Sequence, residues 1–189
     1  MVAEQRDAGP QRGTGAAPSF EVRPSRPADV RSFLDLYRAV VREGRYIRTE
    51  AVRRGTRYYR KTLANGWRAD EASIVAVAEG RVIGHLGISR EEHPTNRHVA
   101  SLGMMVASPW RGRGVGSALM AEAIRWARDV GVEKVALSVY PDNEAGRALY
   151  RKFGFVEEGR LSGHSKKRIG YRDEIVLGLW LIDRPHSEA

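Results

Sequence analysis

The feature that most constrains the fold of this chain is a glycine-rich segment between an apolar run and an amphipathic one. In "SPWRGRGVGSALM", residues 108–120, Gly112, Gly114 and Gly116 stand at alternate positions. Glycine loses more conformational entropy on folding than any other residue, so this spacing needs a structural reason. The run before the segment has a strand pattern and the run after it has a helical one. The sequence therefore predicts a corner at which a strand turns into a helix.

Such a corner has the properties of an anion site. The first amides of a helix have no partner within the helix and lie at the positive end of its dipole. The glycines would let the backbone approach a diphosphate closely, while Arg111 and Arg113 would add positive charge. The dinucleotide fingerprint is excluded because Ser117 occupies the position of its third glycine, and a P-loop is excluded because no G-K-[ST] triplet follows. The corner can therefore cradle a diphosphate, but a purely structural turn explains it equally well, and the residues downstream must decide.

Hydrophobic periodicity on both sides of the corner predicts one mixed α/β domain. Strands are expected at 20–23, 73–78, 81–89, 98–108, 133–140, 156–162 and 171–182. Helices are expected to begin at Pro27, at a Thr49 cap, at the glycine corner and at Asp142 and Asn143, and to end near residues 44, 63, 131 and 154. Residues 1–19 are predicted to be a flexible tail, 20–183 the domain, and 184–189 a short C-terminal tail.

Charge and composition limit the function classes. Lys and Arg number 32 against 23 Asp and Glu, so the formal net charge is +9. This balance favours nucleic acid or a phosphorylated small molecule as partner, although a generally arginine-rich proteome explains it equally well. The absence of cysteine excludes disulfides, thiolate nucleophiles and thiolate metal sites. No apolar run has the roughly 20 residues of a membrane span, and we expect a cytoplasmic protein without a metal.

A second motif lies downstream of the corner. Asn143 is followed seven positions later by Tyr150, and then by "KFGF". Together with "MMVASPWRGRGVG", this pattern resembles the two cofactor motifs of the GNAT superfamily of acetyl-CoA-dependent N-acetyltransferases, over about residues 20–181. The resemblance implies a single-domain α/β fold whose mixed, mostly antiparallel sheet has splayed central strands and is flanked by helices. The final "GYRDEIVLGLWL" is similar to the branch that contains phosphinothricin and amino-acid acetyltransferases.

The resemblance implies acetyl-CoA as cosubstrate, with its diphosphate at the glycine corner and its pantetheine arm beside residues 104–106. The expected cofactor-binding residues are Met104, Met105, Val106, Arg111, Gly112, Arg113, Gly114, Val115, Gly116, Ser117 and Asn143. For the two methionines we expect the backbone to bind, because their side chains suit core filling. Helix capping alone would also explain Asn143.

The resemblance also places Tyr150 at the general-acid position of the family, where a phenol would protonate the departing thiolate. The acceptor is expected to be a primary amine of a small molecule, an amino acid or a protein. Only about one such amine in 2,500 is neutral at pH 7, so a base or a desolvating pocket must help. Relatives carry a carboxylate where this chain has Ser101 or Ser138. His98 is the best-tuned candidate base. Glu43, Glu50 and Glu174 are the further candidates.

Two readings from other classes stay open. An RNA- or ribosome-binding module could use the arginine face of the second helix, although the aromatic platform expected for single strands is missing, so we expect no nucleic-acid partner. A GNAT-like domain could also sense acetyl-CoA without turnover, and Tyr150 favours an enzyme over such a sensor. The sequence leaves open the acceptor, the base, the role of the basic helix and whether the chain forms a homodimer.

Overall fold

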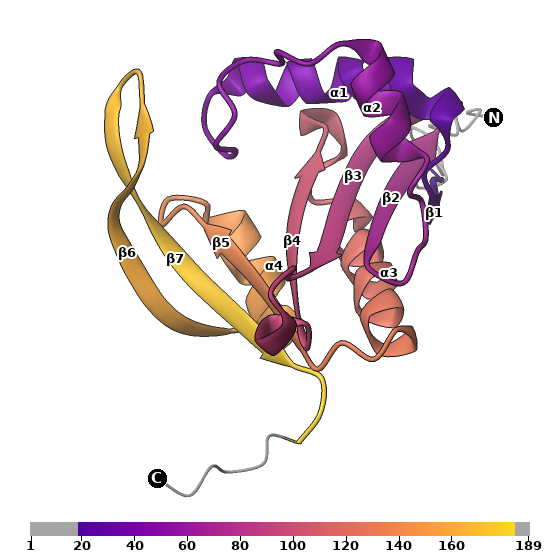
Figure 1. Ribbon diagram of the computed structural model, residues 1–189. Coiled ribbons are helices and arrows are strands. Elements are labelled where there is room, and N and C mark those ends of the chain that lie inside the picture. The colour runs from indigo at the N-terminus through magenta and orange to yellow at the C-terminus, as the bar shows by residue number, and fades with distance from the viewer. Residues whose placement is uncertain (1–18, 184–189) are drawn as a thin grey trace, which may run out of the picture.

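The computed structural model describes residues 19–183, which form a mixed α/β domain (Figure 1). The predicted tails at 1–19 and 184–189 lie outside the described residues, except for Ser19. The strands are β1 (Glu21–Pro24), β2 (Glu71–Ala78), β3 (Arg81–Arg90), β4 (Val99–Val106), β5 (Lys134–Val139), β6 (Val156–Lys167) and β7 (Gly170–Trp180). The helices are α1 (Val30–Glu43), α2 (Thr56–Leu63), α3 (Val115–Asp129) and α4 (Glu144–Lys152).

The seven strands form one sheet in the order β1-β2-β3-β4-β5-β7-β6. Every neighbouring pair is antiparallel except β4 and β5, which run parallel. The β4–β5 ladder joins Val99–Ser101 to Lys134–Ala136 and ends there, although both strands continue. The expected α/β class and the splayed central strands are confirmed.

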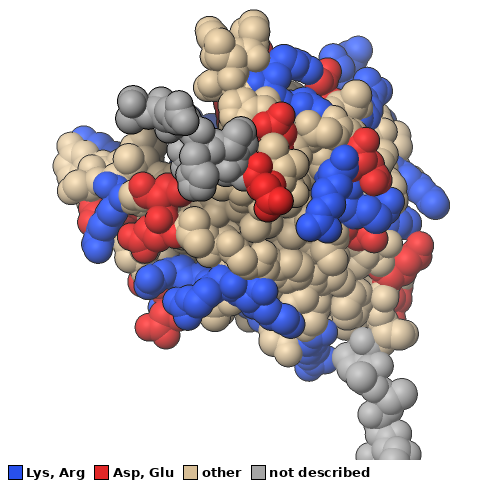
Figure 2. Space-filling model, turned by 90° about the horizontal axis from the view of Figure 1, so that it is seen from below, with Lys and Arg blue, Asp and Glu red and all other residues tan. Residues whose placement is uncertain are grey.

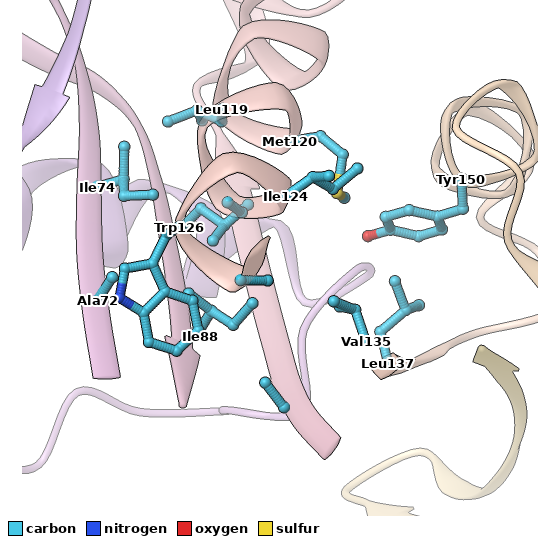
Figure 3. Close-up of a cluster of buried hydrophobic side chains, with 14 of the residues drawn as sticks. Ala72, Ile74, Ile88, Leu119, Met120, Ile124, Trp126, Val135, Leu137 and Tyr150 are labelled. Atoms are coloured by element: carbon cyan, nitrogen blue, oxygen red, sulfur yellow. The ribbon is translucent and has the colours of Figure 1, made fainter. Parts of the chain in front are cut away.

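The main core lies between α3 and the sheet. Leu119, Met120 and Trp126 of α3 are fully buried against the strands, and the indole nitrogen of Trp126 donates a hydrogen bond to the Arg68 carbonyl at 2.7 Å (Figure 3). Gly84 of β3 lets α3 pack closely on the sheet, because a Cβ at this position would lie 3.0 Å from the side chains of Leu119 and Val115. The apolar residues of α3 recur with helical spacing and form one buried face. This face fixes the position of α3, the helix that follows the glycine corner.

Helices α1 and α2 pack together on a second cluster, in which Phe33, Leu34 and Leu63 are buried. Met105 of β4 packs against this cluster, whereas Met104 packs against the α3 core. Neighbouring residues of a strand face opposite sides of the sheet, so the two methionines mark its two faces. Strand β4 therefore contacts the α3 core on one face of the sheet and the α1–α2 cluster on the other.

The sequence-based prediction was wrong in two segments. The second helix begins at Thr56, with Gly55 as its N-cap, and not at Thr49, whose hydroxyl instead forms a hydrogen bond of 2.8 Å with the Tyr37 hydroxyl. Most of the polar loop predicted after residue 162 is instead strand, because β6 and β7 continue as a long hairpin. In both segments contacts between distant parts of the chain outweigh local propensity: Lys167 of the hairpin donates hydrogen bonds to the carbonyls of Gly44 and Ile47.

The surface carries charges of both signs. On the face shown in Figure 2, acidic and basic side chains are interspersed around an uncharged area, so the excess of positive charge does not gather into one basic patch on that face. Of the basic face predicted for the second helix, Arg57, Arg60 and Lys61 lie in α2 and are exposed, and Arg53 and Arg54 are exposed in the segment before it. Among the described residues, none of the helices has the length and apolar character needed to cross a bilayer.

Candidate active site

The glycine corner connects β4 to α3 as predicted. Gly112 and Gly114 have φ angles of +71° and +84°, a left-handed conformation that favours glycine. An added Cβ at either position would meet no heavy atom of residues 19–183 within 4 Å, so both glycines border open space. Gly114 is the N-cap of α3, and within the described chain no side chain caps the helix there. The first amides of α3 are therefore free to bind a ligand.

Gly116 has a different role from its two neighbours. A Cβ at this position would lie 3.1 Å from the Leu149 side chain of α4. Glycine therefore lets α3 and α4 approach each other closely. The requirement for glycine at 116 is steric packing, whereas at 112 and 114 it is backbone conformation.

The two arginines of the corner are engaged with other side chains. Arg111 donates from Nε to the Val106 carbonyl at 3.0 Å, and its Nη1 lies 2.8 Å from Glu43 at the end of α1. Its charge is thus balanced by a carboxylate and is not held free for a phosphate. The guanidinium of Arg113 lies 5.7 Å from the centre of the Trp110 ring. A contact with an aromatic ring leaves the charge of Arg113 in place, so the expectation that the two arginines add positive charge for a diphosphate stays a prediction.

The corner borders a cavity of about 470 Å³, which we call the turn cavity. Most of the expected cofactor-binding residues line it: Met104, Met105, Val106, Arg111, Gly112, Gly114, Gly116, Ser117 and Asn143. Val115 is buried in the core, and Arg113 is exposed. Asn143 caps α4, since its Oδ1 accepts a hydrogen bond of 3.0 Å from the Gly146 amide.

A second cavity of about 480 Å³, which we call the sheet cavity, is lined by residues of β4, β5, β7 and the segment after α1. The residues that line both cavities are Tyr46, Ile47, Met104, Asn143 and Tyr150. The two cavities therefore meet beside Tyr150, where β4 and β5 have separated. A ligand in one cavity can reach a ligand in the other at this point.

Tyr150 extends from α4 into the core, with its hydroxyl directed toward the side of α3 (Figure 3). The side chain is 7% exposed, and burial raises the pKa of its phenol to about 12. Within residues 19–183 its hydroxyl has no hydrogen-bond partner. The phenol is therefore protonated at neutral pH, and its proton is available to a ligand in either cavity.

Arg48 and Glu174 are the only charged side chains of the described residues that line the sheet cavity. Glu174 is 1% exposed and accepts hydrogen bonds from the Nε of Arg48 at 2.9 Å, from its Nη2 and from the Ser165 hydroxyl. Burial by itself raises the pKa of Glu174, but these hydrogen bonds outweigh it and hold the pKa below its ordinary value. Glu174 is thus a carboxylate with both oxygens already hydrogen-bonded.

Ser101 is hydrogen-bonded to a carboxylate, that of Glu91, which the sequence analysis did not identify. Its hydroxyl donates a hydrogen bond of 2.6 Å to Oε1 of Glu91, which directly follows β3. The antiparallel register pairs Ser89 with Ser101, so the next outward residue on that face, Glu91, reaches across to the serine. Ser101 lines the sheet cavity. The sequence could have indicated this pair, because aligning β3 with β4 so that Ser89 faces Ser101 places Glu91 next to Ser101.

Of the candidate bases from the sequence, Glu174 lines the sheet cavity, whereas the other three line neither cavity among the residues 19–183. His98 stands just before β4, where its ring stacks on Trp180 with 6.3 Å between the ring centres, and it is not among the residues of 19–183 that line either cavity. Glu43 is paired with Arg111, and Glu50 accepts a hydrogen bond of 3.0 Å from the amide of Arg168. The structure therefore gives His98 no contact with the site around Tyr150.

Comparison with known proteins identifies relatives of the chain. Residues 36–155 match the model of a family described as the acetyltransferase (GNAT) family. The L-amino acid N-acetyltransferase AaaT of Escherichia coli K12 is 42% identical over 108 residues, which are 55% of this chain and 65% of that protein. The chain thus spans slightly less than two thirds of the length of this curated relative.

Solved structures have the same fold. The ribosomal-protein-alanine N-acetyltransferase of Brucella melitensis has a TM-score of 0.78 at 29% identity, over 85% of this chain and 99% of that one. The acetyltransferase yncA of Salmonella typhimurium, described with its cofactor acetyl-CoA, has a TM-score of 0.80 at 18% identity, over 90% of this chain and 99% of that one. The glycine corner and the splayed strands thus belong to a fold that acetyltransferases use.

We expect Glu174→Gln to lower the free energy of unfolding at pH 7 by about 1.5–3 kcal/mol, because the buried group loses a charged hydrogen bond to Arg48. The folded-state pKa of Glu174 is lowered, so its contribution is complete above the unfolded value near 4.3 and is lost as the pH falls through the lower folded value. The difference in the free energy of unfolding between wild type and variant should therefore become smaller below about pH 4. Urea unfolding at a series of pH values measures it.

The matched control is Glu157→Gln, which changes an exposed glutamate of β6 and should leave the stability almost unchanged. A stability difference for Glu174→Gln that stays constant from neutral to acidic pH would contradict the assignment.

Proposed function

This chain belongs to the GNAT family of acetyltransferases, and on that premise we propose that it transfers the acetyl group of acetyl-CoA to a primary amine. The observation that carries the proposal is the meeting of two cavities beside Tyr150. One cavity borders free helix amides, and the other, of similar volume, is lined by strands β4, β5 and β7. This arrangement suits a reaction in which a large phosphorylated donor and a small acceptor approach from different sides.

The donor is proposed to lie in the turn cavity. The uncapped amides at the start of α3 would bind its diphosphate, and the left-handed glycines at 112 and 114 leave room for it. Beyond Ser101 the edge of β4 has left the β5 ladder, so backbone groups of residues 104–106 can pair with the amides of a pantetheine arm. Acetyl-CoA, which the Salmonella neighbour is described with, has both parts.

Tyr150 is proposed to act as the general acid. When bound, acetyl-CoA supplies a thioester whose carbonyl carbon is attacked by the amine, with release of a thiolate. The Tyr150 hydroxyl would donate its proton to that sulfur. Burial raises the pKa of the phenol to about 12, but the same apolar surroundings raise the pKa of a thiol as well, so the two groups stay matched.

The proton of the acceptor is proposed to leave through Ser101 to Glu91. Glu174 is a poor alternative because its oxygens are already hydrogen-bonded to Arg48 and Ser165. Glu91 accepts from the Ser101 hydroxyl alone among the described side chains. Ser101 would touch the ammonium, and Glu91 would act through it as a positioning residue and final proton acceptor.

The acceptor is proposed to be a small amine such as an amino acid. AaaT, the relative at 42% identity, is named as an L-amino acid N-acetyltransferase. The sheet cavity agrees with a small acceptor, because Lys167 of the hairpin binds the carbonyls of Gly44 and Ile47 at 3.1 and 2.6 Å and so holds the segment after α1 against β6 and β7. A cytoplasmic location without a metal partner completes the proposal.

Replacement of Gly114 by valine should weaken acetyl-CoA binding at least about tenfold, which corresponds to about 1.4 kcal/mol, because the side chain would fill the space in front of the corner. Gly131→Val is the matched control: this glycine has a φ of +71°, also borders open space, and stands at the far end of α3. Both variants should lose similar stability. Calorimetric titration with acetyl-CoA measures the affinities, and equal affinity of the two variants would reject the corner as the diphosphate site.

Tyr150→Phe should lower kcat by roughly 10²–10⁴-fold while the affinity for acetyl-CoA stays nearly unchanged, because the variant keeps the ring and loses only the proton donor. Turnover is followed by thiol release with an amine panel. Tyr171→Phe, which alters a tyrosine that is 70% exposed, serves as control. If Tyr150→Phe kept more than about a third of the wild-type rate, the proton would have to come from another group.

Glu91→Gln should reduce kcat/KM by about 10²-fold at neutral pH, and the loss should become smaller as the pH approaches the pKa of the acceptor amine, where the acceptor loses its proton unaided. Ser101→Ala should show the same pH dependence. Glu92→Gln alters the adjacent exposed glutamate and should behave as wild type. A loss of constant size at every pH would mean that Glu91 has a structural role only.

A further inference from the structure

The sheet cavity contains a polar group that the proposed reaction does not use. Tyr140 follows β5, is 3% exposed and lines this cavity. Among the side chains of residues 19–183, its hydroxyl oxygen is the one polar atom that is itself fully buried and has no hydrogen-bond partner, whereas the unpaired hydroxyl of Tyr150 is not fully buried. Native structures rarely leave such an atom unpaired, and a ligand is one of the explanations when they do.

The Tyr140 ring is held in place by two cations. The guanidinium carbon of Arg172 lies 3.8 Å from the ring centre, and Nζ of Lys167 lies 5.3 Å from it. Arg172 itself is fixed, because it donates to the Arg45 carbonyl at 2.8 Å and pairs with Asp142. The phenol therefore cannot easily turn toward bulk water to find a partner.

Arg48 supplies further unused donors in the same cavity. A guanidinium has five N–H donors, and Glu174 takes one from Nε and one from Nη2. The outer edge, formed by Nη1 and the second hydrogen of Nη2, matches the two oxygens of a carboxylate. The Arg48 side chain is 60% exposed, so this edge is accessible.

The position of Arg48 is set before any ligand binds. Lys167 binds the carbonyl of Ile47, the residue before it, and the amide of Arg168 binds the side chain of Glu50 just after it. Glu174, buried in β7, then fixes the orientation of the guanidinium. A binding group that is held on three sides loses little entropy when its ligand arrives.

The chemistry of the site indicates an anion. Arg48 and Tyr140 offer donors, whereas the one carboxylate of the cavity, Glu174, has its oxygens occupied. Much of the remaining wall is apolar: Ile47, Leu102, Leu137, Val139 and Val176. A planar anion next to an apolar group is what an amino acid with an aliphatic or aromatic side chain presents.

We propose that Arg48 and Tyr140 bind the carboxylate of an amino-acid acceptor, with two parallel hydrogen bonds from the guanidinium and one from the phenol. This inference rests on the proposed function, in which the acceptor is an amine. The same cavity is lined by Ser101 and Tyr150, where the amine would react. The two residues thus determine that the acceptor is a free amino acid, since a lysine within a protein has no carboxylate near its amine.

The test compares matched probes that differ only in the carboxylate. L-leucine and L-phenylalanine are each set against their carboxamides, both as substrates with acetyl-CoA and as ligands of the protein saturated with coenzyme A, followed by calorimetry. The wild-type protein is expected to prefer each acid over its amide by about 10-fold or more in kcat/KM and in affinity.

Two variants test the two donors. Tyr140→Phe should raise the KM of the acids by about 10- to 100-fold and that of the amides by less than about twofold, while its melting temperature stays the same or rises, because the unpaired hydroxyl is removed. Arg48→Lys should also remove the preference for acids, since an ammonium cannot replace the planar pair of donors, while it keeps a cation beside Glu174. Tyr171→Phe and Arg53→Gln change exposed residues and should behave as wild type.

The outcomes separate this inference from the proposed function. Equal use or equal binding of acids and amides by the wild type overturns the carboxylate site, and so does a preference that survives Tyr140→Phe and Arg48→Lys. The absence of binding for acids and amides alike overturns it too. Acids that bind through Arg48 and Tyr140 without being acetylated would support the site and reject the proposed transferase activity.

Discussion

The early end of the β4–β5 ladder is the constraint on which the rest of the site depends. Parallel pairing stops at Ser101 and Ala136, although each strand continues for several residues. Backbone groups on the facing edges are then left without sheet partners, and such groups must bind something else. The turn cavity, the sheet cavity and Tyr150 all lie where the strands separate. A sheet that closed normally here would have neither cavity.

Helix α3 packs on the sheet and also presents the uncapped amides of the proposed diphosphate site. Its buried face packs on β2, β3 and β4 through Leu119, Met120 and Trp126, so the start of the helix cannot move relative to β4. The glycines then turn the chain sharply enough for the first amides to face the turn cavity. The glycines at the start of this segment form the proposed ligand site, and the apolar residues that follow pack in the core. Each part therefore requires its own residue types.

The sequence predicted what depends on local pattern and missed what depends on register. The corner, the Asn143 cap and the mixed α/β class follow from residue type and spacing, whereas the splayed central strands and the role expected of Tyr150 came from the family resemblance. The partner of Ser101 is Glu91, ten positions earlier, and it becomes visible only when β3 and β4 are aligned. The pairing of Arg111 with Glu43 was also missed, because Glu43, at the end of α1, is 68 positions away in the chain. His98 has a suitable imidazole but lies at the end of β4 where the ladder is intact.

The contacts of Lys167 bear on how such a site can change during evolution. This lysine holds the segment after α1 through main-chain carbonyls of Gly44 and Ile47, and Arg172 holds it through that of Arg45. Every amino acid has a carbonyl, so the path of the segment does not depend on which side chains it carries. Selection can therefore exchange the residues that face the sheet cavity while the backbone that presents them stays where it is. Descendants of one ancestral protein can acquire different acceptors in this way without rebuilding the wall of the cavity.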